Sequence, residues 1–150
     1  MIKKLILVIL LVSVLLSGCI TASVTNSDKA ITQEDRQWIF NNNNDYTAIH
    51  SIFNGAQEAD MHQDYHALQD FGVALTSVTD KSMQRSLNTT LSPGLRPAQR
   101  AWDSTMRELN NAGWELIAYG NSHGDDTHYY KCLNLESEAS DCYSIYRNYL

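Results

Sequence analysis

The chain has 150 residues, of which 11 are Lys or Arg and 17 are Asp or Glu, so its formal net charge at pH 7 is -6. This length suits one domain with a single hydrophobic core and is short for two domains. The acidic balance argues against nucleic acid as a partner and against electrostatic docking on anionic lipid.

The first 18 residues have the composition of an export signal. Lys3 and Lys4 precede an apolar run over residues 5–16 in which only Ser13 is polar, and small residues follow. A helix needs about 20 apolar residues to cross the hydrocarbon core of a bilayer. We therefore expect a signal peptide over residues 1–18 that is removed, and not a transmembrane helix.

Leu16-Ser17-Gly18-Cys19 resembles the lipobox of prokaryotic lipoproteins. The resemblance implies cleavage after Gly18 and diacylglycerol on the sulfur of Cys19; the alternative is an ordinary signal peptide with a chance cysteine. Ile20 stands where Asp would mark inner-membrane retention in Gram-negative lipoproteins. We expect an exported protein, anchored by lipid on Cys19 to the cell membrane or the outer membrane, with its domain on the extracytoplasmic side.

Cleavage would leave 132 residues with 9 basic and 17 acidic side chains, a net charge of -8. Attachment to the membrane would then depend on the lipid and not on a basic protein surface. Residues 19–31 are small and polar without periodicity, which predicts a flexible tether. The sequence assigns residues 32–150 to one folded domain.

Apolar residues recur at steps of three and four along four segments of this domain, which is the spacing of one helix face. The four sets are Tyr46, Ile49, Phe53 and Ala56, with Trp38 and Ile39 before them; Met61, Tyr65, Leu68, Gly72, Leu75 and Val78; Ala98, Trp102, Thr105, Leu109, Ala112, Leu116 and Tyr119; and Cys132, Leu135, Ala139, Cys142, Tyr146 and Tyr149. Short joints make neighbouring helices antiparallel, so we predict an all-α, up-down-up-down helical bundle. The tether and the joint at residues 92–96 would share one end, and the other two joints the membrane-distal end.

Two local signals bear on the ends of the first two helices. Residues 41–44 are four asparagines, which are weak helix formers and could break the first helix. Asp60 and Gln63 have the spacing of a capping box at the start of the second helix.

The last two helices carry clearer signals. Pro97 suits the first turn of the third helix and Gly120 its C-terminal cap. Gly113 in its middle indicates a close helix contact. Asp125 or Asp126 is the expected N-cap of the fourth helix.

Two resemblances bear on the fold. The turn Ser92-Pro93-Gly94-Leu95-Arg96-Pro97 and the later Asn111-Ala112-Gly113 resemble uncharacterised archaeal exported proteins, a likeness that covers about residues 45 to 149 and implies an all-helical fold without an activity. Gly113-Trp114-Glu115-Leu116 is instead similar to a strand motif of an uncharacterised α+β family. That alternative predicts an α+β domain with a C-terminal hairpin.

Cys132 and Cys142 test the fold because they are ten residues apart. On one straight helix they would lie about 15 Å apart, beyond disulfide reach. A hairpin or a break between Asn134 and Asp141 would permit the bond that exported domains usually form. Free thiols and a disulfide both stay open.

Four histidines gather near the two distal joints of the predicted bundle: His62, His66, His123 and His128. His62 and His66 share a helix face at i and i+4, as a chelating pair must. Imidazole and carboxylate groups could bind a divalent transition metal such as zinc, copper, nickel or iron. The alternative is that Asp and His simply cap and solvate helix ends here.

Signals for catalysis are weak. Gly120-Asn121-Ser122-His123-Gly124 fits the pattern of a nucleophile elbow, but it follows a helical segment and no parallel sheet is predicted. No sequence motif for a di-iron bundle, haem attachment, zinc protease or phosphate loop occurs. We therefore predict no enzyme.

The sequence favours a membrane-anchored, non-catalytic binding or interaction module of the cell envelope, with an envelope protein or a small ligand as its partner. Trp102, Trp114, Tyr65 and Tyr119 could line a ligand groove, although aromatic residues at helical spacing are more often core. The alternative function is an envelope metal-binding protein that uses the distal His and Asp side chains.

Overall fold

A computed structural model describes residues 31–150 of the chain. The described part contains four long helices and one short 3-10 helix: α2 (Gln33–Met61), α3 (Tyr65–Asn88), η1 (Pro93–Leu95), α4 (Arg96–Asn121) and α5 (Asp126–Asn148). The predicted signal peptide, Cys19 and all but the last residue of the predicted tether lie outside the described residues.

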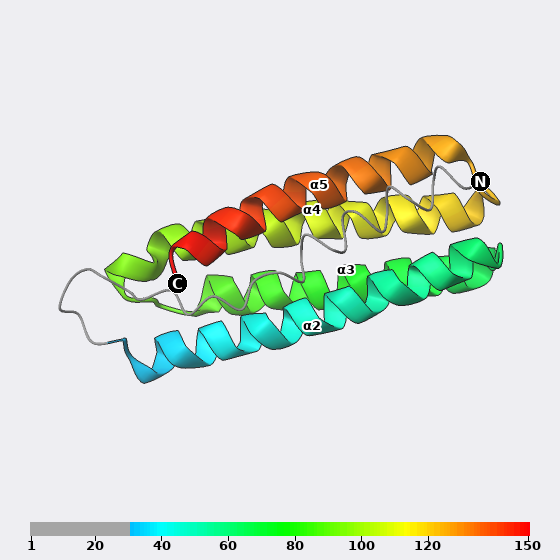
Figure 1. Cartoon of the computed structure of the whole chain (residues 1–150). Helices are drawn as coiled ribbons and strands as arrows, with labels where there is room; N and C mark the ends of the chain where they lie inside the picture. The colour runs from blue at the N-terminus through cyan, green and yellow to red at the C-terminus, as the bar shows by residue number, and fades with distance from the viewer. Residues whose placement is uncertain (1–30) are drawn as a thin grey trace.

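The helices form the predicted up-down-up-down bundle (Figure 1). The start of α2, the connection through η1 and the C-terminus lie at one end, and the turns α2–α3 and α4–α5 lie at the other. No strand occurs between residues 31 and 150. The α+β alternative is therefore wrong: Trp114 and Leu116 lie inside α4, where the apolar spacing of three and four continues.

The start of α2 is fixed by a capping box. The backbone N–H of Asp35 donates to Thr32 Oγ1 at 3.1 Å, and the N–H of Thr32 donates back to Asp35 Oδ2 at 2.9 Å. The helix then continues through the four asparagines, and Asn42 is buried. The four asparagines therefore do not break the first helix.

The predicted capping box of Asp60 and Gln63 is wrong. Asp60 belongs to the last turn of α2, and Gln63 adopts a left-handed conformation with φ of 56°. The N-cap of α3 is Asp64, which accepts the N–H of Ala67 at 3.0 Å. Two aspartates four residues apart offered the same capping chemistry, and the length of α2 decided between them.

The ends of α4 and α5 agree with the prediction in part. Asp125 is the N-cap of α5 and accepts the N–H of Thr127 at 2.8 Å. Gly120 is not a cap, since α4 continues to Asn121 and ends with Ser122 as its C-cap. The left-handed residue that requires glycine is Gly124, with φ of 95°.

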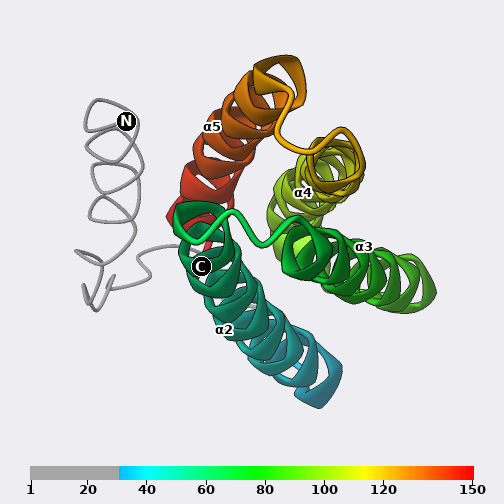
Figure 2. The ribbon, with the colours of Figure 1, turned by 90° about the vertical axis from the view of Figure 1, so that its right-hand side faces the viewer.

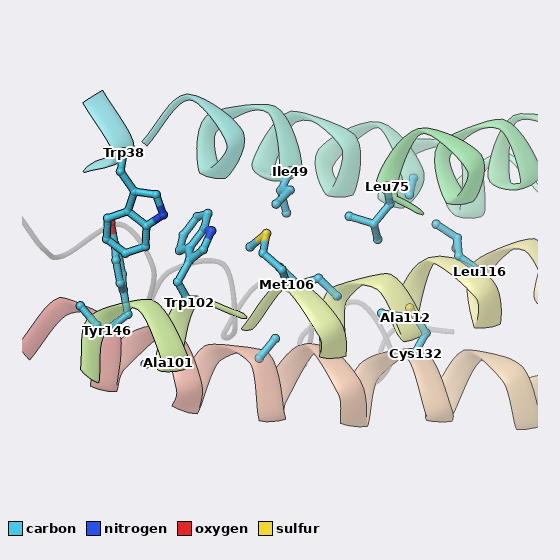
Figure 3. Packing of buried hydrophobic residues seen from close by; sticks show 14 of the residues in the cluster. Trp38, Ile49, Leu75, Ala101, Trp102, Met106, Ala112, Leu116, Cys132 and Tyr146 are labelled. Carbon is cyan, nitrogen blue, oxygen red and sulfur yellow. The ribbon is translucent and has the colours of Figure 1, made fainter. Parts of the chain in front are cut away.

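The core lies between the pairs α2–α3 and α4–α5 (Figure 3). At the end near the C-terminus, three aromatic rings from α2, α4 and α5 meet. Trp102 is fully buried, its ring centroid lies 4.9 Å from that of Tyr146, and Tyr146 meets Trp38 edge to face at 5.9 Å. The indole N–H of Trp102 donates to Ser82 Oγ at 3.0 Å, so this large side chain is buried without an unpaired donor.

Backbones approach most closely between α3 and α4 and between α4 and α5, and α4 lies between its two neighbours (Figure 2). Gly72 and Gly113 face each other across the first of these contacts. A Cβ on Gly72 would lie 2.7 Å from the carbonyl oxygen of Gly113, and one on Gly113 would lie 3.1 Å from that of Gly72. The prediction that Gly113 marks a close helix contact is confirmed. We call this contact the glycine seam.

Asp35 also ties the start of α2 to the connection between α3 and α4. Its carboxylate accepts the N–H of Ser92 at 3.0 Å and the hydroxyl of Ser92 at 2.5 Å, in addition to its bonds with Thr32. The side chain is fully buried. Burial raises the pKa of Asp35, but the hydrogen bonds from Ser92 and Thr32 outweigh it and lower the pKa to about 2.

Within residues 31–150, no helix combines the length and the apolar character that a membrane span requires.

Candidate ligand-binding groove

The turns at residues 62–64 and 122–125 meet at one end of the bundle, as predicted. The Tyr119 hydroxyl donates to Asp60 Oδ1 at 2.7 Å and links α4 to α2. The ring of Tyr65 lies 6.3 Å from that of Tyr119 and 5.7 Å from the imidazole of His123. Aromatic and hydrogen-bond contacts therefore hold this end of the bundle together.

The four histidines at this end do not form a cluster. His62 is exposed, and His66 is exposed with its Nδ1 3.3 Å from Asp70 on the same helix. The His123 Nδ1 lies 3.1 Å from the carbonyl oxygen of Asn121, and the His128 Nδ1 lies 2.6 Å from Glu115 Oε2. Each of the last three imidazoles has a different neighbour.

Over residues 31–150, the structure places no three His, Cys, Asp or Glu side chains where they could jointly hold a metal ion. A metal site at His62, His66, His123 and His128 stays a prediction without support from this arrangement. Calorimetry with zinc, copper and nickel, beside a His62→Ala, His66→Ala double variant, tests it.

Ser122 takes part in the turn and not in a nucleophile elbow. Its hydroxyl donates to the carbonyl oxygen of Tyr119 at 3.1 Å and accepts the N–H of Asp125 at 3.2 Å. It follows a helix, whereas an elbow follows a strand. The hydroxyl closes the turn between α4 and α5.

Cys132 and Cys142 both lie on α5 and are free thiols. The helix is unbroken between them, so the geometric argument against a disulfide applies. Cys132 is buried and Cys142 is partly exposed. Burial raises the pKa of both thiols, that of Cys132 well above its usual range.

An apolar groove of about 130 Å³ lies between α2 and α5, with residues of α4 and Leu68 of α3 beneath it. Its walls are mainly aliphatic and aromatic. The lining residues include Tyr46, Ile49, Phe53, Ala56, Leu109, Leu116, Tyr119, Tyr129, Cys132, Leu133, Glu136, Ala139, Ser140 and Tyr143. Concave apolar surfaces with a few polar groups are typical of small-molecule sites.

The groove exists because α2 and α5 meet through long side chains and not through their backbones. Tyr46 of α2 stacks on Tyr143 of α5 with centroids 4.3 Å apart and planes at 5°. The small side chains of Ala56, Ala139 and Ser140 lie among these large rings. Such a mixture leaves space that a row of medium-sized residues would fill.

Glu136 is the notable polar residue of the groove. The Cys132 thiol donates to Glu136 Oε1 over 3.9 Å, a weak contact for a carboxylate. Burial raises the pKa of Glu136 to about 8, although the Cys132 contact acts in the opposite direction. An acidic side chain that holds its proton near neutral pH is unusual outside ligand-binding or catalytic sites.

The rest of the groove is acidic or neutral. Asp60 also lines it, and no Lys or Arg is among the described lining residues; Arg147 lies nearby, against the lining residue Tyr143. The hydroxyl of Tyr46 and the Nε2 of His50 are buried, and neither has a hydrogen-bond partner within the described part of the chain. The lining therefore offers hydrogen-bonding groups and negative charge to a molecule that enters.

Sequence reasoning identified the groove only in part. Of the four aromatic residues named as possible lining, Tyr119 lines it. Tyr65 packs against the ring of Tyr119 and is not a lining residue, Trp102 is in the core, and Trp114 is 60% exposed. The sequence prediction missed Glu136. Its position four residues after Cys132 and three before Ala139 places a carboxylate on the apolar face of α5, which was the available signal.

No family model, curated protein or solved structure matches this chain.

Proposed function

We propose that the chain is an exported lipoprotein, held on a membrane by lipid on Cys19, whose helical domain binds a small, largely apolar molecule in the groove between α2 and α5. The lipobox at residues 16–19 supports the anchor. The groove supports the binding function and is the observation that carries it. The protein acts by binding and not by catalysis, since its sequence carries no catalytic motif in a suitable context.

The size of the groove favours a small ligand over a partner protein. A cavity of about 150 Å³ in a protein core holds one benzene molecule, and this groove measures about 130 Å³. Stable protein interfaces bury about 800 Å² on each partner. A ring-sized molecule, or one ring of a somewhat larger one, fills the space between Tyr129, Tyr143 and the α4 side chains.

The test uses the acylated protein in lipid nanodiscs, with empty nanodiscs as the background. We expect saturation-transfer NMR to detect indole or benzyl alcohol on the protein. Ser140→Phe places a ring in the groove and should abolish the signal. Ser144→Phe adds the same ring one turn later on the exposed side of α5 and should leave the signal unchanged. Equal signals from both variants would overturn the binding function.

The anchor has its own test. Mass spectrometry of the intact protein should find a chain that begins at Cys19 and carries acyl groups. Cys19→Ser should leave the chain unacylated. If another peptidase removes the signal peptide, the chain should leave the membrane fraction; if none does, the signal peptide should stay attached. A membrane-bound wild-type chain without acyl groups would contradict the proposal.

A further inference from the structure

The inference rests on the proposed function and concerns the chemical class of the ligand. We propose that the groove selects a molecule that has an apolar ring or chain and a protonated amine, and that the ammonium group pairs with the carboxylate of Glu136.

The first argument is the position of the carboxylate. Glu136 lies on the apolar face of α5, between Cys132 and Ala139, and lines the groove. Its recorded partner in the described residues is the thiol of Cys132 at 3.9 Å, and a thiol is a weak donor. A carboxylate oxygen can accept further hydrogen bonds, and an ammonium group offers three donors.

The second argument is charge complementarity. The groove contains Glu136 and Asp60 and, among the described residues that line it, neither Lys nor Arg. Asp60 already accepts the Tyr119 hydroxyl at 2.7 Å, so Glu136 is the less satisfied of the two carboxyl groups. A neutral ligand would leave the ionised form of Glu136 without a counter-ion, and an anionic ligand would be repelled.

The third argument is the aromatic lining. Phe53, Tyr129 and Tyr143 surround the same space, and Tyr143 is held in place by its stacking on Tyr46. The faces of aromatic rings attract cations, and aromatic residues line sites that recognise organic ammonium groups. The lining thus suits both parts of an arylalkyl amine.

Benzylamine and benzyl alcohol make the test, because they share size and shape and differ in charge. At pH 8.5 Glu136 is mostly ionised, since its pKa is about 8, and the amine is still cationic. We expect the acylated protein in nanodiscs to bind benzylamine about tenfold more tightly than benzyl alcohol, measured by NMR titration against empty nanodiscs.

Glu136→Gln should lower the affinity for benzylamine about tenfold and leave that for benzyl alcohol unchanged. Glu138→Gln, on the exposed side of the same helix, should change neither. The comparison of the two ligands on the wild-type protein needs no variant, so it holds even if Glu136→Gln fails to fold.

Equal affinity for the two probes would overturn the inference and leave the proposed binding function in place. The same holds if benzyl alcohol binds and benzylamine does not. Failure of both probes, together with no indole signal, would instead remove the binding function itself. A preference for benzylamine that Glu136→Gln does not reduce in a folded variant would also overturn the role of Glu136.

Discussion

The glycine seam between α3 and α4 and the groove between α2 and α5 are two solutions to helix packing in one bundle. At the seam, Gly72 and Gly113 let the backbones approach until no Cβ fits. At the groove, Tyr46, Tyr129 and Tyr143 keep the backbones apart and small residues between them leave space. The bundle therefore has one contact fixed by backbone atoms and one that a small molecule can complete.

The largest effect that we expect is a decline of the free energy of unfolding with rising pH, caused by Glu136 in the groove. The pKa of Glu136 is raised from 4.5 to about 8 in the folded protein, so the folded state keeps a proton that the unfolded state releases. Its contribution favours folding below pH 4.5 and declines as the pH rises to about 8. We expect a loss of about 3 kcal/mol over this window, because each pKa unit is worth about 1.4 kcal/mol and solvent in the groove reduces the full value.

Denaturant unfolding of wild type and Glu136→Gln between pH 5 and 8.5 measures this contribution. The variant should show a smaller decline in the free energy of unfolding, and Glu138→Gln should behave as the wild type does. Parallel curves for wild type and Glu136→Gln would contradict the raised pKa.

The next effect is at the glycine seam. Gly72→Ala places a Cβ 2.7 Å from the carbonyl oxygen of Gly113 and 2.9 Å from the backbone nitrogen of Ile117. Backbone atoms cannot move aside as a flexible side chain can, so we expect a loss of about 2 to 3 kcal/mol in the free energy of unfolding. Gly94→Ala is the control, since no atom lies within 4 Å of its Cβ position. Similar melting temperatures for both variants would refute a seam closed by backbone contact.

A third effect concerns the capped start of α2, which lies outside both regions. The pKa of Asp35 is lowered to about 2, so its contribution is complete above the unfolded value of about 4 and is lost as the pH falls toward 2. We expect Asp35→Asn to cost about 2 kcal/mol at pH 7 and to lose little more on acidification to pH 2.5, whereas the wild type should decline. Thermal unfolding at pH 7 and pH 2.5 checks both statements.

The smallest effect has the opposite sign. Ser140→Leu adds apolar atoms to the groove, where there is space, and should raise the free energy of unfolding by about 1 kcal/mol. The same kind of addition at Gly72 should lower it. If Ser140→Leu destabilises the protein by more than 1 kcal/mol, the groove is not available space and the contrast with the seam fails.

The sequence predicts the helices well because their apolar residues repeat without interruption. Between Ala98 and Tyr119, the apolar residues are spaced alternately four and three positions apart, and they form the buried face of α4. Gly113 lies at a close helix contact, as expected. Helix ends were harder, since Asp60 and Asp64 have the same capping chemistry and only the continuation of α2 selects Asp64. The residues next to each aspartate do not show which of the two caps α3.

The candidate site was less predictable for a different reason. Periodicity fixes which face of a helix is buried, but it does not say how far apart two buried faces lie. The groove depends on that distance. In the same way, the i, i+4 spacing of His62 and His66 could be read from the sequence, whereas the pairing of His128 with Glu115 depends on how α5 lies against α4.

The two thiols of α5 give the bundle an internal chemical reporter. Cys132 is buried and lines the groove, while Cys142 on the same helix is partly exposed. Because Cys132 lines the groove, a molecule bound there covers its thiol, so we expect the rate at which an alkylating reagent modifies Cys132, relative to Cys142, to fall when the groove is occupied. The helix that would bind the ligand thus also records whether its own groove is occupied.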